Sequence, residues 1–283
     1  MNNAVNGVAV GVKQYKIEST FLEREVMIDF YLPPSQNNSI SLLLINDGQD
    51  LPLMPFTRIL DSLYDQQYIT SLLCAGIHCG TDRKMEYGTA NTLHYAGFGG
   101  KAGAYTRFVI QELLPFIRHT FSSFSFKNIS FAGFSLGGLS ALDIVLNNPK
   151  EFINVGVFSG SLWWRSKKYG KGYSDDKDRI MHQQVREGGY YPWLKFFFEC
   201  GTLDEVADRN NNGVIDSIDD TLDLIQELKK KGYSDDAIKY VELPEGMHNV
   251  ATWARAFPQF LAWAFRNDNN RVKMPGEADN TLR

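Results

Sequence analysis

One stretch of the sequence reads Ile129-Ser130-Phe131-Ala132-Gly133-Phe134-Ser135-Leu136-Gly137, and a helical pattern continues over residues 139–147. The apolar run indicates a strand, so the Gly-x-Ser-x-Gly pentapeptide is expected to turn sharply from this strand into the helix. Glycines two places before and after Ser135 let neighbouring backbone approach closely at such a turn. The helix start also directs amide groups towards developing negative charge. We therefore predict that Ser135 is a nucleophile; a plain helix-capping turn is the alternative.

Strand and helix patterns alternate along the chain, as expected for a mostly parallel sheet covered by helices on both faces. Two alternating runs, 12–19 and 26–32, indicate an antiparallel N-terminal hairpin. Further strands are predicted at 41–46, 69–77, 128–132, 154–159, 193–199 and 237–243, and helices include 56–68, 139–147 and 221–231. The sequence thus predicts an α/β fold of the α/β-hydrolase type, with residues 1–283 forming a single catalytic domain.

The bulk composition excludes several classes of protein. The 283 residues are 43% hydrophobic, enough for one large core, and the formal net charge is −4. No lysine and arginine block could neutralise a run of phosphates, so no nucleic-acid partner is expected. No segment reaches about 18 uninterrupted apolar residues, so no membrane association is expected either.

Cysteine usage and the chain start bear on the compartment. Cys74, Cys79 and Cys200 lack the paired spacing of a zinc site, which favours a reducing environment. No signal peptide is visible, so we expect a cytoplasmic location, or a periplasmic one if a leader has been removed. The oligomeric state is not indicated by the sequence.

A serine hydroxyl needs a general base, and in this fold the chain order is serine, acid, histidine. His182 and His248 are the two histidines after Ser135. His182 lies in a polar stretch, so we expect it at the surface. His248 follows the last predicted strand and precedes an apolar helix, which is where the base belongs, and we assign it that role.

The acid is expected directly after the preceding strand. That strand runs into Asp204, whose carboxylate could hold the tautomer of His248 and stabilise the imidazolium; Glu205 and Asp208 are alternatives. The oxyanion would bind two backbone amides, one from Leu136 and one from Gln49 in the loop after the third strand, with Gly48 as the alternative donor.

Several segments together resemble the putative esterase family that contains enterochelin esterases and esterase D. The segments are Asp47-Gly48-Gln49, Arg83 with Glu86-Tyr87, Gly133 to Gly138, Ser159-Gly160-Ser161-Leu162-Trp163-Trp164, and Gly246-x-His248 with Trp253. The resemblance extends over about residues 12–265, and the tryptophan pair and the arginine segment point to the enterochelin-esterase-like branch. It implies hydrolysis of carboxylic esters without fixing the acyl group.

Three residues outside the expected triad are candidates for substrate binding. Trp163 and Trp164 follow a predicted strand and could line a pocket for the acyl or alcohol group, or pack within the protein. Arg83, with Glu86 nearby, could orient the substrate or form a structural ion pair.

A second motif lies at residues 208–219. Asp208, Asn210, Asn212, Asp216 and Asp219 occupy the first, third, fifth, ninth and twelfth positions of an EF-hand-like calcium loop, with Gly213 sixth and the Val214 carbonyl at the seventh. The alternative is an Asn- and Asp-rich turn in which Asp219 or Asp220 caps the following helix. Calcium bound here would be structural, and an Asp208 that ligates it could not serve His248.

These features predict a serine carboxylesterase that forms an acyl-enzyme on a small or aromatic acyl ester, with no cofactor required for the chemistry. An acyltransferase would use the same triad and differ in the acceptor. A noncatalytic relative would bind a small molecule without turnover. The expected partner in each case is a small molecule, an ester if the protein is an enzyme.

Overall fold

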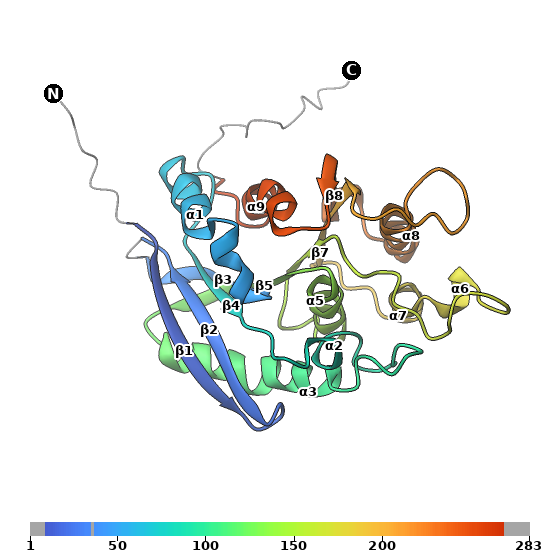
Figure 1. Ribbon diagram of the computed structural model, residues 1–283. Coiled ribbons are helices and arrows are strands. Elements are labelled where there is room, and N and C mark those ends of the chain that lie inside the picture. Colours follow the sequence, from blue (N-terminus) through green and yellow to red (C-terminus); the bar gives the residue numbers. More distant parts are fainter. Residues whose placement is uncertain (1–8, 35–36, 269–283) are drawn as a thin grey trace, which may run out of the picture.

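The computed structural model describes residues 9–34 and 37–268, and the ends and residues 35–36 of the predicted 1–283 domain lie outside these ranges. In the described part, strands form one sheet in the order β1-β2-β4-β3-β5-β6-β7-β8 (Figure 1). Their bounds are β1 Gly11–Ser19, β2 Arg24–Leu32, β3 Ser39–Asn46, β4 Leu72–Ile77, β5 Ser125–Phe134, β6 Asn154–Phe158, β7 Lys195–Leu203 and β8 Ile238–Met247.

The N-terminal pair β1 and β2 is antiparallel and the sheet is otherwise mostly parallel, as the sequence predicted. β1 pairs with β2 in full register from Gly11 opposite Leu32 to Ser19 opposite Arg24, and β2 runs antiparallel to β4. From β4 to β8 every neighbouring pair is parallel. β4 and β6 are buried along their whole length, which explains their continuous apolar sequences.

Helices cover both faces of the sheet and give the protein two hydrophobic layers (Figure 1). α1 and α9 pack on one face, where Phe257 contacts the rings of Phe56 and Phe158. α3, α4, α5, α7 and α8 contribute to the other face. Truncating a fully buried ring such as Phe257 to alanine would cost roughly 3–5 kcal/mol of unfolding free energy.

The helical segments have the following bounds: η1 Gly48–Leu53, α1 Phe56–Asp65, α2 Arg83–Glu86, α3 Ala102–Arg107, η2 Phe108–Leu113, α4 Leu114–Thr120, α5 Leu136–Asn147, α6 Asp175–Asp178, α7 Ile180–Glu187, α8 Asp216–Lys231, η3 Asp235–Ala237 and α9 Val250–Ala264. None of the helices among the described residues is long and apolar enough to cross a membrane.

Two expectations about local structure were wrong. α8 begins at Asp216, five residues earlier than predicted, so Asp219 and Asp220 lie inside the helix and do not cap it. His182 is fully buried on α7, where Nε2 contacts the Asp220 carbonyl at 2.8 Å, and is not at the surface. The polar residues around it had masked the α7 face that packs against α8.

Candidate active site

Ser135 lies at the junction of β5 and α5 with φ 55° and ψ −122°, a conformation that costs a non-glycine residue about 1–3 kcal/mol. Contacts on both sides fix it there: the Ser135 amide donates to the Phe158 carbonyl at 2.8 Å, and the Ser161 amide donates to the Ser135 carbonyl at 3.1 Å. A Cβ atom on Gly133 would lie 2.3 Å from the Gly137 carbonyl oxygen, so the turn requires a glycine. The predicted strand–turn–helix geometry is therefore present around the serine.

The predicted acid and base lie at the ends of the last two strands. Asp204 follows β7 with a fully buried side chain, and His248 follows β8 with a half-exposed one. The His248 Nδ1 and Asp204 Oδ1 atoms are 4.0 Å apart. A hydrogen bond would need a shortening of roughly 1 Å, and catalytic hydrogen bonds are often this loose before substrate binds. Among the three predicted acids, Asp204 is the one placed against His248, whereas Asp208 accepts amides of its own loop.

A residue that the sequence analysis did not single out orients the acid. The Ser159 hydroxyl donates to Asp204 Oδ1 at 3.0 Å and accepts from the Trp253 indole at 2.8 Å. These two bonds are buried and connect β6, the β7 end and α9. Ser159 directly follows β6, which pairs with β7, so the rule that site residues gather at the carboxyl ends of parallel strands could have found it.

Burial sets the protonation behaviour of the acid and base. It lowers the pKa of His248, and Arg83 lowers it further, although the Asp204 charge opposes both. Burial raises the pKa of Asp204, while the Ser159 hydrogen bond and the His248 charge oppose this change. A lowered pKa keeps the imidazole neutral at neutral pH, the form that a general base requires.

The two predicted oxyanion donors occupy the first turns of two helical segments. Leu136 is the first residue of α5, and Gln49 is the second of η1, directly after Gly48. Backbone amides at such positions have no partner within their helix and are available to an anion. A Cβ atom on Gly48 would lie 2.2 Å from the Gly76 carbonyl carbon, so this loop packs directly on β4.

Arg83 braces this region through an ion pair. Its guanidinium donates to both carboxylate oxygens of Asp47, at 2.7 and 2.6 Å. The Asp47 carboxylate is buried and lies so close to Gly137 that a Cβ atom there would be 2.6 Å from Oδ2. Arg83 thus links the loop after β3 to the start of α5, and Glu86 pairs separately with Arg24.

The two tryptophans have different environments. Trp164 is 1% exposed and packs against Gly88 and Gly99, whereas Trp163 is 36% exposed. The guanidinium carbon of Arg165 lies 6.0 Å from the centre of the Trp163 ring. Trp164 therefore belongs to the core, and Trp163 is the one of the pair that can present a face to a ligand.

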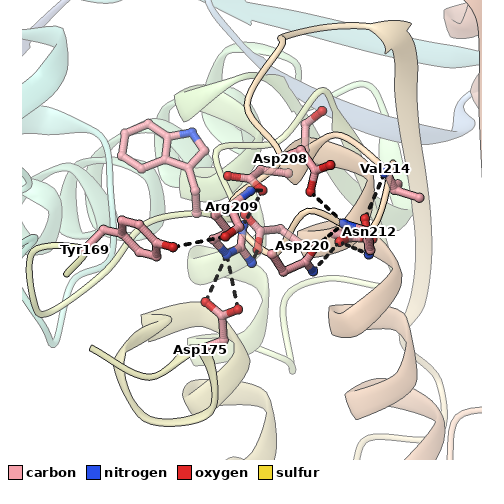
Figure 2. A network of polar contacts seen from close by, with 12 residues as sticks. Tyr169, Asp175, Asp208, Arg209, Asn212, Val214 and Asp220 are labelled. Atoms are coloured by element: carbon pink, nitrogen blue, oxygen red, sulfur yellow. Dashed lines mark hydrogen bonds and ion pairs between the residues drawn. The ribbon is translucent and has the colours of Figure 1, made fainter. Parts of the chain in front are cut away.

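The loop at 208–219 folds into a compact series of side-chain to backbone contacts (Figure 2). The Asp208 carboxylate accepts from the Asn212 and Gly213 amides, and the Asn212 side chain accepts from the Val214 amide. The Asn210 and Asn212 side-chain amides both donate to Asp219 Oδ2, at 2.9 and 2.8 Å. Asp216 accepts from the Arg209 amide.

Arg209 joins this loop to the segment after Trp164. Its buried guanidinium forms ion pairs with Asp175, Asp216 and Asp220, and its carbonyl accepts from the Tyr169 hydroxyl (Figure 2). Arg179 adds a second buried pair with Asp220. The loop is therefore held by arginine–carboxylate pairs on its inner side.

Known proteins resemble this chain over most of its length. A Bacillus subtilis protein named "Uncharacterized protein YbbA" is 23% identical over 250 residues, which cover 86% of this chain and 93% of that protein. The enterobactin esterase FES of Shigella flexneri has a TM-score of 0.67 at 19% identity over 93% of this chain. A structure named ferulic acid esterase has a TM-score of 0.66 at 16% identity, covering 91% of this chain and 98% of its own.

This chain spans 62% of the length of the Shigella enzyme. At these identities the solved structures establish the shared fold alone. A family model described as "Putative esterase" matches residues 19–264, which include the Ser135 turn, Asp204 and His248. The chain therefore belongs to the putative esterase family, which agrees with the resemblance noted from its motifs.

Proposed function

We propose that this protein is a serine carboxylesterase with Ser135, His248 and Asp204 as its triad. His248 takes the proton from the Ser135 hydroxyl as the serine attacks the ester carbonyl. The Leu136 and Gln49 amides stabilise the oxyanion, and water then cleaves the acyl-enzyme after His248 has protonated the leaving alcohol. The expected substrates are esters with a small or aromatic acyl group.

The observation that carries this proposal is the strained backbone of Ser135 in an otherwise regular strand–helix junction. A φ of 55° at a non-glycine residue is costly and persists where the surroundings enforce it. Ser135, Asp204 and His248 each directly follow a strand of the same parallel set, β5, β7 and β8, so all three lie at the carboxyl-end edge of the sheet. Family membership agrees with the same chemistry.

A fluorophosphonate tests whether Ser135 is activated. The wild-type protein should gain one adduct by intact mass, mapped to Ser135, and the Ser135→Ala variant should gain none. Ser161→Ala is the matched control, because its hydroxyl lies 3.5 Å from that of Ser135 but has no assigned nucleophilic role. If the folded wild-type protein takes up no label, the esterase proposal is wrong and the protein is a noncatalytic binding protein.

Product analysis separates the esterase from an acyltransferase. Hydrolysis of an activated ester in the presence of added alcohols should yield mainly the free acid if water is the preferred acceptor. Predominant transfer to the alcohol at low alcohol concentration would assign the protein to the acyltransferases, with the same acyl-enzyme.

The exposed Trp163 supports an aromatic acyl group. A flat indole face beside Arg165 can stack on an aromatic ring, and such contacts are worth about 0.5–1.5 kcal/mol beyond buried area. Trp163→Ala should therefore raise KM for an aryl-acyl ester several-fold and leave KM for an acetyl ester nearly unchanged. Equal effects on both esters would remove Trp163 from the acyl site.

The loop at 208–219 supports a second proposal, a structural calcium ion. Asp208, Asn210, Asn212, Asp216 and Asp219 with the Val214 carbonyl form an all-oxygen set, which suits a hard cation. The contacts that draw Asn210 and Asn212 to Asp219 bring the third, fifth and twelfth positions together. Among the described residues no three His, Cys, Asp or Glu side chains gather closely enough to hold a metal ion, so the proposed site depends on Asn210, Asn212 and the Val214 carbonyl as further ligands.

Calorimetric titration of the metal-stripped protein with calcium chloride tests this site. One calcium ion should bind to the wild-type protein and raise its melting temperature. The Asp208→Ala variant should neither bind calcium nor gain in melting temperature. Asp235→Ala, on the exposed η3 segment, is the control. If the wild type shows no heat and no change in melting temperature, the loop is an Asn- and Asp-rich turn without a metal.

A further inference from the structure

A second acidic side chain is buried beside the triad acid. Glu199 lies on β7 and is 1% exposed. Ser159 lies between the two residues, since its amide donates to the main-chain carbonyl of Glu199 at 2.8 Å while its hydroxyl donates to the Asp204 carboxylate. The triad as described gives Glu199 no role.

Three carboxyl oxygens in this cluster lack a donor. Asp204 Oδ2 and both Glu199 side-chain oxygens are buried and have no hydrogen-bond partner among the described residues. The contacts of Asp204 with Ser159 and His248 both involve Oδ1, so Oδ2 has no donor from either residue. A buried oxygen without a donor costs about 1–3 kcal/mol.

The charges around Glu199 cannot neutralise two carboxylates. Its titratable and charged neighbours are Asp204 at the end of β7, Cys200 beside it, Tyr240 on β8 and Arg255 on α9. The Arg255 side chain is exposed and donates to the Pro244 carbonyl. Two ionised carboxylates near each other in a buried environment repel each other, so one of them retains a proton.

The proton belongs on Glu199. Asp204 accepts a hydrogen bond from the Ser159 hydroxyl and lies beside the His248 ring, and both stabilise its charge, whereas the Glu199 side-chain oxygens have no hydrogen-bond partner among the described residues. Burial and the Asp204 charge raise the pKa of Glu199 to about 8, and the Ser159 polar groups oppose this only in part. Glu199 is therefore a carboxylic acid at neutral pH.

We propose that Glu199 is a positioning residue for the triad acid: its carboxyl remains protonated beside Asp204, and this proton supplies the donor that Asp204 Oδ2 lacks. The inference rests on the proposed esterase function for its kinetic consequence. Its structural content, a neutral buried acid at residue 199, is independent of turnover.

Infrared spectroscopy tests the protonation state without any assay of activity. At pH 7 the wild-type protein should show the carbonyl stretch of a protonated carboxylic acid that is absent from Glu199→Gln and that decays as the pH rises past about 8. Asp143→Asn is the matched control, because Asp143 is a buried carboxyl on α5 with a pKa raised by burial to about 6. A spectrum unchanged by Glu199→Gln would overturn the proposal.

The kinetic test compares pH profiles of kcat/KM for an activated ester. Glutamine keeps a donor but cannot ionise, so Glu199→Gln should retain activity at pH 7 within about threefold and lose the alkaline decline near pH 8. Glu199→Leu, which offers no donor, should lose about tenfold at pH 7, the equivalent of about 1.4 kcal/mol. Asp143→Asn should keep the wild-type profile.

The outcomes separate the two proposals. A wild type that neither turns over ester nor takes up fluorophosphonate contradicts the esterase, and the infrared band alone then decides the state of Glu199. An active wild type whose alkaline decline persists in Glu199→Gln overturns the positioning role. Thermal melting of Glu199→Gln and Glu199→Leu identifies a variant that fails to fold, and the other variant then carries the comparison.

Discussion

The protein has two clusters of buried acidic side chains, one at the end of β7 and one on α8, and their charges are neutralised in different ways. In the first, Glu199 and Asp204 share one hydroxyl donor and a half-exposed histidine. In the second, buried Asp220 is paired with both Arg179 and Arg209. This protein pairs the buried Asp220 with arginines, whereas no arginine forms an ion pair with Asp204 in the part of the chain that the structure describes. This difference separates a site arranged for proton transfer from a structural network.

The largest expected effect is that asparagine substitution lowers activity in the first cluster and stability in the second. Asp204→Asn should lower kcat by about 10³- to 10⁴-fold because the histidine loses the carboxylate that fixes its tautomer. Its free energy of unfolding should change little or rise, since a buried charge is removed. Asp220→Asn should do the reverse and lose roughly 3–5 kcal/mol of stability, because Arg179 and Arg209 lose the buried carboxylate that they share.

Steady-state kinetics and denaturant unfolding of both variants make this comparison. A large loss of stability in Asp204→Asn with little loss of kcat would assign that cluster a structural role as well. A loss of kcat in Asp220→Asn as severe as that in Asp204→Asn, with stability intact, would join the Asp220 network to the active site.

The next effect is the contribution of Arg209 in the second cluster to the free energy of unfolding. Arg209→Met should lower the free energy of unfolding by about 3–5 kcal/mol, because three carboxylates lose a buried partner. Arg118→Met is the control: Arg118 and its partner Glu151 are both exposed, and such pairs contribute about 0–1 kcal/mol. Equal melting temperatures for the two variants would show that the buried network is no more stabilising than a surface pair.

A third effect is the pH dependence of the free energy of unfolding, which arises because no cation pairs with Glu199 among the described residues of the first cluster. An ordinary glutamate pKa is 4.5, and that of folded Glu199 is about 8. Between these values the unfolded chain releases a proton that the folded protein retains, so folding is progressively destabilised as the pH rises. Above the folded pKa the cost is constant.

Glu199→Gln removes this cost, so its stability relative to wild type should increase between pH 5 and pH 8 by roughly 2–4 kcal/mol. Urea unfolding of both proteins at the two pH values measures the difference. A difference that is the same at both pH values would mean that the Glu199 carboxyl has an ordinary pKa in the folded protein.

Local patterns predicted the sheet and the strand–turn–helix junction at Ser135, because those features depend on short-range periodicity and on glycine. The β5–Ser135–α5 junction and the N-terminal hairpin lie close to their expected residues. The burial of His182 and the start of α8 were missed, because the Arg179–Asp220–Arg209 pairs connect residues about 10 to 40 positions apart and allow a polar sequence to be buried. Ser159 and Glu199 were missed for a related reason, since their importance comes from strand neighbours.

The smallest expected effect is on the ionisation of His248. Activity requires the neutral imidazole, so kcat/KM should rise with pH, with a midpoint below the ordinary histidine value of 6.5, because burial and Arg83 outweigh the Asp204 charge. In Asp204→Asn the residual activity should have a still lower midpoint, since the charge that raises the His248 pKa is gone. Rates with a neutral aryl ester between pH 5 and pH 8 measure both midpoints. A wild-type midpoint above 6.5 would mean that the Asp204 carboxylate dominates over burial, and the first cluster would then resemble the second, with the imidazolium in the place of an arginine.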